Sequence, residues 1–184
     1  GWEKPVYVHL PTVLNKERKK LSKRHGDVSV DDFRNKGYLP EGLVNYLALV
    51  GWSPEDNQEL LSMEEMINKF SFERVSKTGG IFDKDKLDWV NGHYIRSSST
   101  EKIKDMAIPY LIDRGFVDEK FSDENIDWML MLVETVKESL STVSEIGDKV
   151  EFIFQEEIRI DEETYNEFLS DENAQILMKA IINE

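Results

Sequence analysis

The spacing of apolar side chains predicts a short extended head followed by a mainly α-helical body. Residues 6–10 (VYVHL) are β-branched and aromatic and lie between two prolines, which favours a strand or extended entry. Residues 12–14 continue that segment, and we expect a turn over residues 15–19. Beyond this point apolar residues recur at the three- and four-residue spacing of amphipathic helices.

The first helical signals have recognisable ends. Pro40 precedes an apolar run over residues 43–50, and Gly51 suits a C-terminal stop. Ser62 and Glu65 have the spacing of a capping box in front of a further apolar segment. These signals predict two helices in the first 70 residues or so of the chain.

A flexible break is predicted at residues 78–80, which contain two glycines. Asp83 then suits the N-cap of a helix with an apolar stripe of Leu87, Val90 and Tyr94. After residues 97–100 the helical spacing resumes, in a segment that we expect Pro109 to kink or end.

The last third of the chain is also predicted to be helical. We expect Ser122 to cap the longest periodic segment, residues 126–140, and Gly147 to break it. Residues 150–154 are assigned to a helix. Two further amphipathic segments are expected over residues 165–169 and 174–182.

Composition narrows the class of protein. The 184 residues suffice for one generous domain or two small ones, and 40% of them are hydrophobic, which is typical of a globular protein. No cysteine is present, which excludes disulfides and thiolate metal sites. No apolar run approaches a membrane span, so we expect a cytoplasmic protein without a membrane partner. Because the chain starts with Gly1 and the next residues suggest packed structure, we expect it to be a piece of a longer protein.

Charge is unevenly distributed along the chain. Residues 1–36 hold nine Lys or Arg against five Asp or Glu, whereas residues 37–184 hold 14 against 32. Six cations crowd one short segment: Lys16, Arg18, Lys19, Lys20, Lys23 and Arg24. An acidic body repels a polyanion at long range, so any nucleic-acid contact must be local. The segment is either a solvated basic loop or a phosphate site, since lysines, a hydroxyl and backbone amides are phosphate ligands.

The stretch KLSKR, residues 20–24, resembles the KMSKS signature of class I aminoacyl-tRNA synthetases. Residues 1–14 and 25–54 on either side are similar to bacterial-type glutamyl-tRNA synthetases. Residues 81–96 (IFDKDKLDWVNGHYIR) are similar to the stem-contacting helices of that family. Beyond residue 96 only the helical layout and the acidic character agree.

The resemblance implies a function in two steps. Glutamate attacks the α-phosphate of ATP, and the terminal ribose of tRNA(Glu) then takes the acyl group. It implies that Lys23 contacts ATP and that Lys20 helps to order the loop, both as catalytic residues. The ATP-binding set is Lys20, Leu21, Ser22, Lys23 and Arg24.

The partners that the resemblance implies are ATP, glutamate and tRNA(Glu). Mg²⁺ is expected from the family, although no motif here binds it, and we expect a monomer.

The same resemblance divides the chain into three parts. Residues 1–36 would end the catalytic domain, residues 37–118 would form a helical stem-contact domain, and residues 119–184 would form a truncated anticodon-binding domain of the α-helical cage type. The HIGH signature and the amino-acid pocket of the family are absent from this sequence. We therefore expect the chain alone to be inactive.

Candidate tRNA contacts follow from the similar segments. They are Lys84, Lys86, Trp89, Asn91, Arg96 and, for the anticodon, Lys137. Trp89 is equally compatible with a core position, since it lies beside the apolar stripe. The sequence leaves open whether glutamine tRNA is also charged.

The sequence offers less support for a metal site and for functions other than that of a glutamyl-tRNA synthetase. His9, His25 and His93 are too scattered for a metal site and are interpreted as structural. The main alternative function is a non-catalytic helical module that binds tRNA or another protein. Glutaminyl-tRNA synthetases would continue with β-barrels after the loop, and the short tRNA-modifying paralogue lacks the helical extension.

Overall fold

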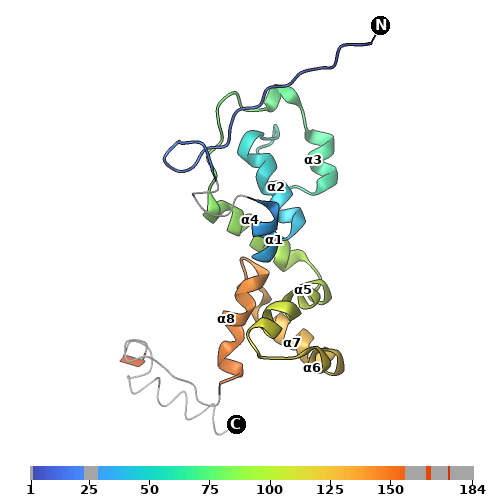
Figure 1. The fold of residues 1–184 in the computed structure, drawn as a ribbon, viewed down its shortest axis with the longest axis vertical. Helices are drawn as coiled ribbons and strands as arrows, with labels where there is room; N and C mark the ends of the chain where they lie inside the picture. Colours follow the sequence, from blue (N-terminus) through green and yellow to red (C-terminus); the bar gives the residue numbers. More distant parts are fainter. Residues whose placement is uncertain (1, 23–28, 156–164, 167–173, 175–184) are drawn as a thin grey trace. The chain divides into compact units, whose positions relative to one another are not determined.

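The computed structural model describes residues 2–22, 29–155, 165, 166 and 174, and the structural statements below concern these residues. The described chain is mainly α-helical (Figure 1), which confirms the predicted fold class. The chain divides into two compact units, residues 1–150 and residues 151–184, and each is described by itself. Within the described ranges, no helix has the length and apolar character needed to cross a membrane.

For residues 6–10 we predicted a strand or an extended entry, and of these two alternatives the strand does not form. Val6 and Tyr7 are 91% and 88% exposed. β-Branched and aromatic residues form a strand when a partner strand and a core face are available, and the described residues provide neither here. The turn predicted over residues 15–19 is confirmed.

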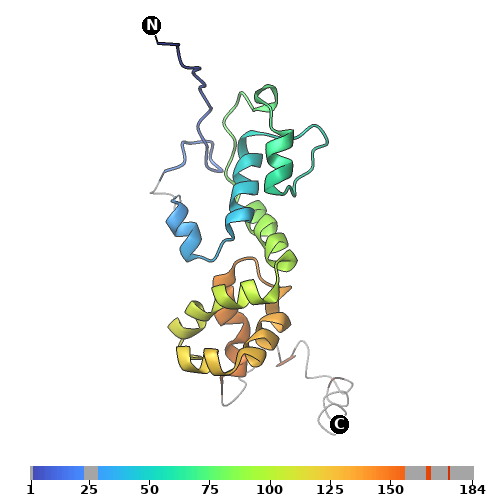
Figure 2. The same ribbon diagram turned by 90° about the vertical axis from the view of Figure 1, so that its right-hand side faces the viewer.

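Two helices form the core of the first half of this unit. They are α2 (Pro40–Gly51) and α4 (Lys84–Ser97), and the short α1 (Val30–Asn35) precedes them. Figure 2 shows α2 and α4 side by side. Their core is made of Phe33, Tyr38, Leu43, Tyr46, Leu87 and Val90. The predicted stripe on α4 is confirmed, because Leu87 and Val90 are fully buried and Tyr94 packs against the same core.

Predicted caps and stops are also confirmed in this region. Gly51 is the last residue of α2, and Ser62 and Glu65 form the capping box of α3 (Met63–Lys69). The Asp83 carboxylate accepts from the Asp85 N–H at 3.0 Å and so caps α4. A single 3-10 turn, η2 (Phe72–Arg74), follows α3.

The break predicted at residues 78–80 is confirmed, since no helix or strand forms there, but its two glycines are closely packed positions. A Cβ on Gly80 would overlap the Val50 carbonyl oxygen, and one on Gly79 would lie 2.5 Å from the Thr12 carbonyl oxygen. Glycine is therefore needed here for close backbone approach.

The second half of this unit contains α5 (Thr100–Asp113), α6 (Glu119–Glu124), α7 (Ile126–Lys137), η3 (Val143–Glu145) and α8 (Ile146–Val150). Pro109 lies inside α5, which continues to Asp113. Figures 1 and 2 show these helices gathered into one bundle, in which α5 contacts both α7 and α8.

Two predicted helix boundaries in this half are wrong. Ser122 is buried inside α6, whose cap is Asp118, and α7 has no side-chain cap. Gly147 lies within α8, where a Cβ would come within 3.1 Å of the Arg114 side chain. In both cases tertiary packing overrides a local sequence signal.

The second unit is described only in part. The helix predicted for residues 150–154 is a single 3-10 turn, η4 (Glu151–Ile153), directly after α8. The segments predicted at residues 165–169 and 174–182 lie outside the described residues, except for Tyr165, Asn166 and Ala174.

Candidate functional site

The structure describes the first three residues of the KLSKR stretch. Lys20 is exposed, and Leu21 and Ser22 are partly buried. Lys23 and Arg24, on which the predicted ATP contact depends most, lie outside the described residues, as does His25. The site is therefore built from the base of the loop and from the helix beside it.

A tight turn leads into the loop. The Asn15 N–H donates to the Lys19 carbonyl oxygen and the Lys19 N–H donates to the Asn15 side chain, both at 2.8 Å. Arg18 has φ 59°, in the left-handed region that such turns use. The Leu21 N–H then donates to the Val13 carbonyl oxygen at 3.0 Å, which closes the turn at its base.

This turn is attached to the segment that precedes α4. The Leu14 N–H donates to the Gly80 carbonyl oxygen, and the Phe82 N–H donates to the Leu14 carbonyl oxygen, both at 2.8 Å. Leu14 thus pairs with Lys20 on one side and with Ile81 on the other. Because Gly79 and Gly80 allow the backbones to approach, the start of the loop and the start of α4 form one packed junction.

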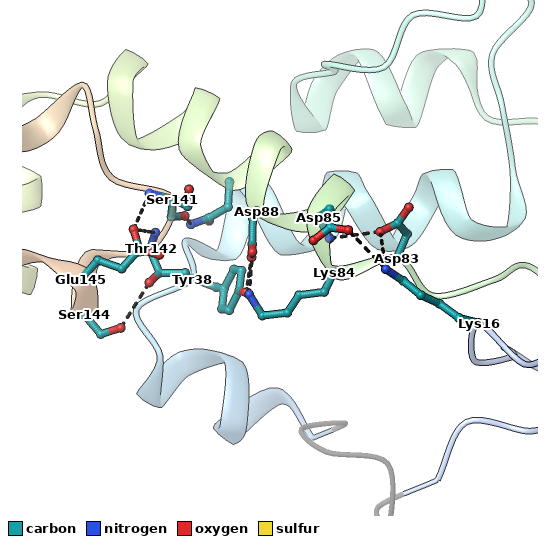
Figure 3. Close-up of polar contacts among 11 residues, drawn as sticks. Lys16, Tyr38, Asp83, Lys84, Asp85, Asp88, Ser141, Thr142, Ser144 and Glu145 are labelled. Atoms are coloured by element: carbon teal, nitrogen blue, oxygen red, sulfur yellow. Dashed lines mark hydrogen bonds and ion pairs between the residues drawn. The ribbon is translucent and has the colours of Figure 1, made fainter. Parts of the chain in front are cut away.

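Ion pairs reinforce the junction. The Lys16 ammonium lies 3.2 Å from the Asp85 carboxylate and 3.8 Å from the Asp83 carboxylate. Figure 3 shows Lys16 directed at both acids, of which Asp83 is the N-cap of α4 and Asp85 lies in its first turn. The hydrogen bond to Asp85 is the largest cause of a pKa of Lys16 above its ordinary value.

Further along α4, two predicted tRNA contacts are engaged by acids. Lys84 pairs with Asp88 and Lys86 pairs with Glu59, each at 2.5 Å. The Tyr38 hydroxyl donates to the other oxygen of Asp88 (Figure 3). These lysines remain on the surface, but each would have to leave a carboxylate to bind a phosphate.

The aromatic and guanidinium groups of α4 lie near its surface. The Trp89 residue is 47% exposed, so the core alternative for this residue is wrong. Arg96 is partly buried, and its guanidinium lies beside Gly92, one turn earlier on the helix. An exposed tryptophan and nearby cations are suitable for contact with nucleic acid.

Asn91 and Lys137 have other partners. Asn91 is fully buried; its oxygen accepts from the Leu39 N–H at 2.8 Å and its nitrogen donates to the Ser141 carbonyl oxygen at 2.6 Å. Lys137 is 8% exposed, and its ammonium donates to the Ser98 carbonyl oxygen at 2.5 Å. Both side chains join segments of the protein, so neither is retained among the candidate tRNA contacts.

The two described histidines are apart from this junction. His9 and His93 are exposed, and the His93 ring contacts the Tyr94 ring. Across the residues that the structure describes, no three His, Cys, Asp or Glu side chains gather in a way that could hold a metal ion.

Comparison with known proteins gives the family. The sequence model described as "tRNA synthetases class I (E and Q), catalytic domain" matches residues 1–89, and the model "Anticodon binding domain" matches residues 102–184. Glutamate–tRNA ligases of Clostridioides difficile and Alkaliphilus metalliredigens are each 52% identical to the chain, over 98% and 100% of it. The chain belongs to the glutamate–tRNA ligase family.

A solved structure agrees with this family. A crystal structure of a glutamate tRNA ligase from Elizabethkingia meningosepticum, in complex with its amino acid, matches with a TM-score of 0.73 at 30% identity. That match covers 97% of this chain and 38% of the other. The chain spans 37% of the length of the two curated ligases named above.

In this chain the catalytic-domain match includes the loop junction and the first turns of α4, and the anticodon-domain match begins in α5. Sequence reasoning identified the cations of the loop but missed the acids of α4 that engage Lys16. The available signal was the Asp-x-Asp spacing of Asp83 and Asp85 at a helix start, of which only Asp83 was interpreted, as a cap.

Proposed function

We propose that the complete gene product carrying this chain is a glutamate–tRNA ligase that acts as a monomer. Glutamate would attack the α-phosphorus of ATP and release pyrophosphate, and the terminal ribose hydroxyl of tRNA(Glu) would then attack the acyl carbon and release AMP. The observation that carries the proposal is the KLSKR stretch on its packed junction, in a chain 52% identical to named ligases over nearly its whole length.

The proposed role of the loop is electrostatic. Charge that develops on the reacting phosphate is stabilised by cations held in place before the reaction. Lys23 would contact ATP, Lys20 would help to order the loop, and Leu21, Ser22 and Arg24 would complete the binding set. The residues described here do not form a carboxylate site suited to Mg²⁺, so we assign no step to that ion.

The proposed tRNA surface is the outer side of α4. We include Lys84, Lys86, Trp89 and Arg96 in it, and we leave out Asn91 and Lys137 because their side chains are buried. We keep the division into catalytic end (1–36), stem-contact domain (37–118) and anticodon-binding domain (119–184) as part of this proposal. The overall acidic charge favours a focused contact with the tRNA over a broad basic patch.

The test is glutamate-dependent exchange between ATP and pyrophosphate by the complete gene product, with tRNA(Glu) present. Lys23→Ala should lower the exchange rate far more than it weakens tRNA binding, since its role is in the transition state. Lys19→Ala is the matched control, because Lys19 is an exposed cation of the same run outside the ATP-binding set. No exchange by the wild type would favour the non-catalytic tRNA-binding module.

A further inference from the structure

Lys16 differs from its basic neighbours in what it contacts. Its ammonium lies within 4 Å of two carboxylates, Asp83 and Asp85, 67 and 69 residues further along the chain. No ion pair is recorded within the described ranges for the next three cations of the run, Arg18, Lys19 and Lys20. Of the four cations of the run that the structure describes, Lys16 is therefore the one held in an ion pair by the protein itself.

The carboxylates that engage Lys16 occupy a defined place. Asp83 is the N-cap of α4 and Asp85 lies in its first turn, where negative charge is favoured by the helix dipole. Their positions are set by α4, which is packed on α2 through fully buried Leu87 and Val90. Lys16 thus connects the turn before the KLSKR loop to a fixed helix end.

Backbone hydrogen bonds attach the two ends of the turn to their surroundings. The bonds to Gly80 and Phe82 fix Leu14, and the bond to Val13 fixes Leu21. Residues 16–18 lie between these ends, where the Arg18 N–H donates within the turn itself, to the Asn15 carbonyl oxygen at 2.9 Å. Within the described residues, the ion pairs that join residues 16–18 to the start of α4 are those of Lys16 with Asp83 and Asp85. A loop that is already ordered loses less conformational entropy when a ligand binds.

We propose that Lys16 is a positioning residue of the ligase, which holds the base of the KLSKR loop against α4 and does not bind ATP. The proposal rests on the function proposed above. It separates Lys16, which orients the loop, from Lys20, Lys23 and Arg24, the cations of the proposed ATP-binding set.

The first test is a double-mutant cycle in the complete gene product, at low ionic strength because exposed pairs are screened by salt. Lys16→Met and Asp85→Asn should each lower kcat/KM for ATP in the exchange reaction by about two- to fivefold, the effect expected of an exposed ion pair. The double variant should lose no more than either single variant. Lys16→Arg should restore the rate, and so should the exchanged pair Lys16→Asp with Asp85→Lys.

The second test needs no activity and uses this chain. Without ATP, amide hydrogen exchange of Leu14 and Leu21 should be faster in Lys16→Met than in wild type, because the turn opens more often. Lys19→Met is the matched control and should leave both amides unchanged, since it removes the same charge from the same turn without an ion pair.

The outcomes separate the two proposals. Additive losses in the cycle, with unchanged amide exchange in Lys16→Met, would overturn the positioning role and point to direct ATP binding by Lys16. A wild-type protein without any glutamate-dependent exchange would instead overturn the proposed function, while faster amide exchange in Lys16→Met would still support the link between Lys16 and α4.

Discussion

The side-chain amide of Asn91 joins α4 to the segment after α7 by donating to the Ser141 carbonyl oxygen at 2.6 Å. The same side chain accepts from the Leu39 N–H, just before α2. A single buried residue thus connects three segments that are up to about a hundred residues apart. The helix that contacts the loop junction at its start therefore contacts the helical bundle further along.

We expect Asn91→Ala to lower the free energy of unfolding by roughly 2–4 kcal/mol, because it leaves a buried N–H and a carbonyl oxygen without partners. Urea unfolding followed by circular dichroism measures this effect. His93→Ala is the control, since His93 is exposed on the same helix. Similar losses in both variants would show that the interior hydrogen bonds of Asn91 contribute little.

The glycines of the loop junction provide a steric prediction. Gly80→Ala should lower the free energy of unfolding by roughly 1–3 kcal/mol, because the new methyl group overlaps the Val50 carbonyl oxygen and the backbones must separate. Gly51→Ala is the matched variant, since the space around Gly51 is open and alanine favours the last turn of α2. It should be neutral or stabilising by up to about 1 kcal/mol. If both variants unfolded alike, the close packing at Gly80 would be refuted.

Local signals predicted most of the fold, and they failed where distant segments decide the structure. The capping box at Ser62 and the stripe of Leu87 and Val90 depend on residues within one helix, so the sequence contains all the information. The close packing of Gly80 could not be predicted, because it depends on the carbonyl oxygen of Val50, thirty residues earlier in the chain. Ser122 resembled a cap, but burial placed it inside α6.

The candidate site shows the same limit. The KLSKR stretch was recognisable because its residues are contiguous. Asn91 and Lys137 were predicted as tRNA contacts from the family resemblance, yet each is buried and donates to a backbone carbonyl some 40 to 50 residues away. The spacing of apolar residues predicts which face of a helix is buried, but it does not predict which distant segment packs on that face.

Alkaline pH should destabilise the α2–α4 core through Tyr46. Burial raises the pKa of Tyr46 to about 12; the hydrogen bond from the Asp83 N–H acts against this shift and the charge of Asp83 adds to it. Burial and Asp88 also raise the pKa of Tyr38. The unfolded chain ionises near the ordinary value of 10.0, so above that pH it binds fewer protons than the folded chain.

The stabilising contribution of Tyr46 is therefore complete below about pH 10 and is lost as the pH rises towards about 12. Urea unfolding at several pH values across this window should show a loss of roughly 2 kcal/mol from this group. Tyr46→Phe should start less stable, because the Asp83 N–H loses its acceptor, and should lose less stability across the window. Parallel curves for the two proteins would exclude Tyr46 as the titrating group.

The proposed tRNA surface on α4 predicts opposite effects for the two members of one ion pair. Lys86 donates to Glu59 at 2.5 Å, so tRNA phosphate and Glu59 compete for the same ammonium. Lys86→Ala should weaken binding of tRNA(Glu) and reduce the slope of log K against log salt by about 1, the value for one lost phosphate contact. Glu59→Gln should strengthen binding, because it releases Lys86 and removes a repelling charge.

Filter binding at several salt concentrations would measure both effects on the complete gene product. Lys77→Ala is the charge-matched control, since Lys77 is exposed and lies outside α4. If Lys77→Ala and Lys86→Ala changed the slope equally, net charge alone would account for binding. A change confined to Lys86→Ala, with tighter binding by Glu59→Gln, would support a tRNA contact at α4, because only a local phosphate contact depends on which lysine is removed.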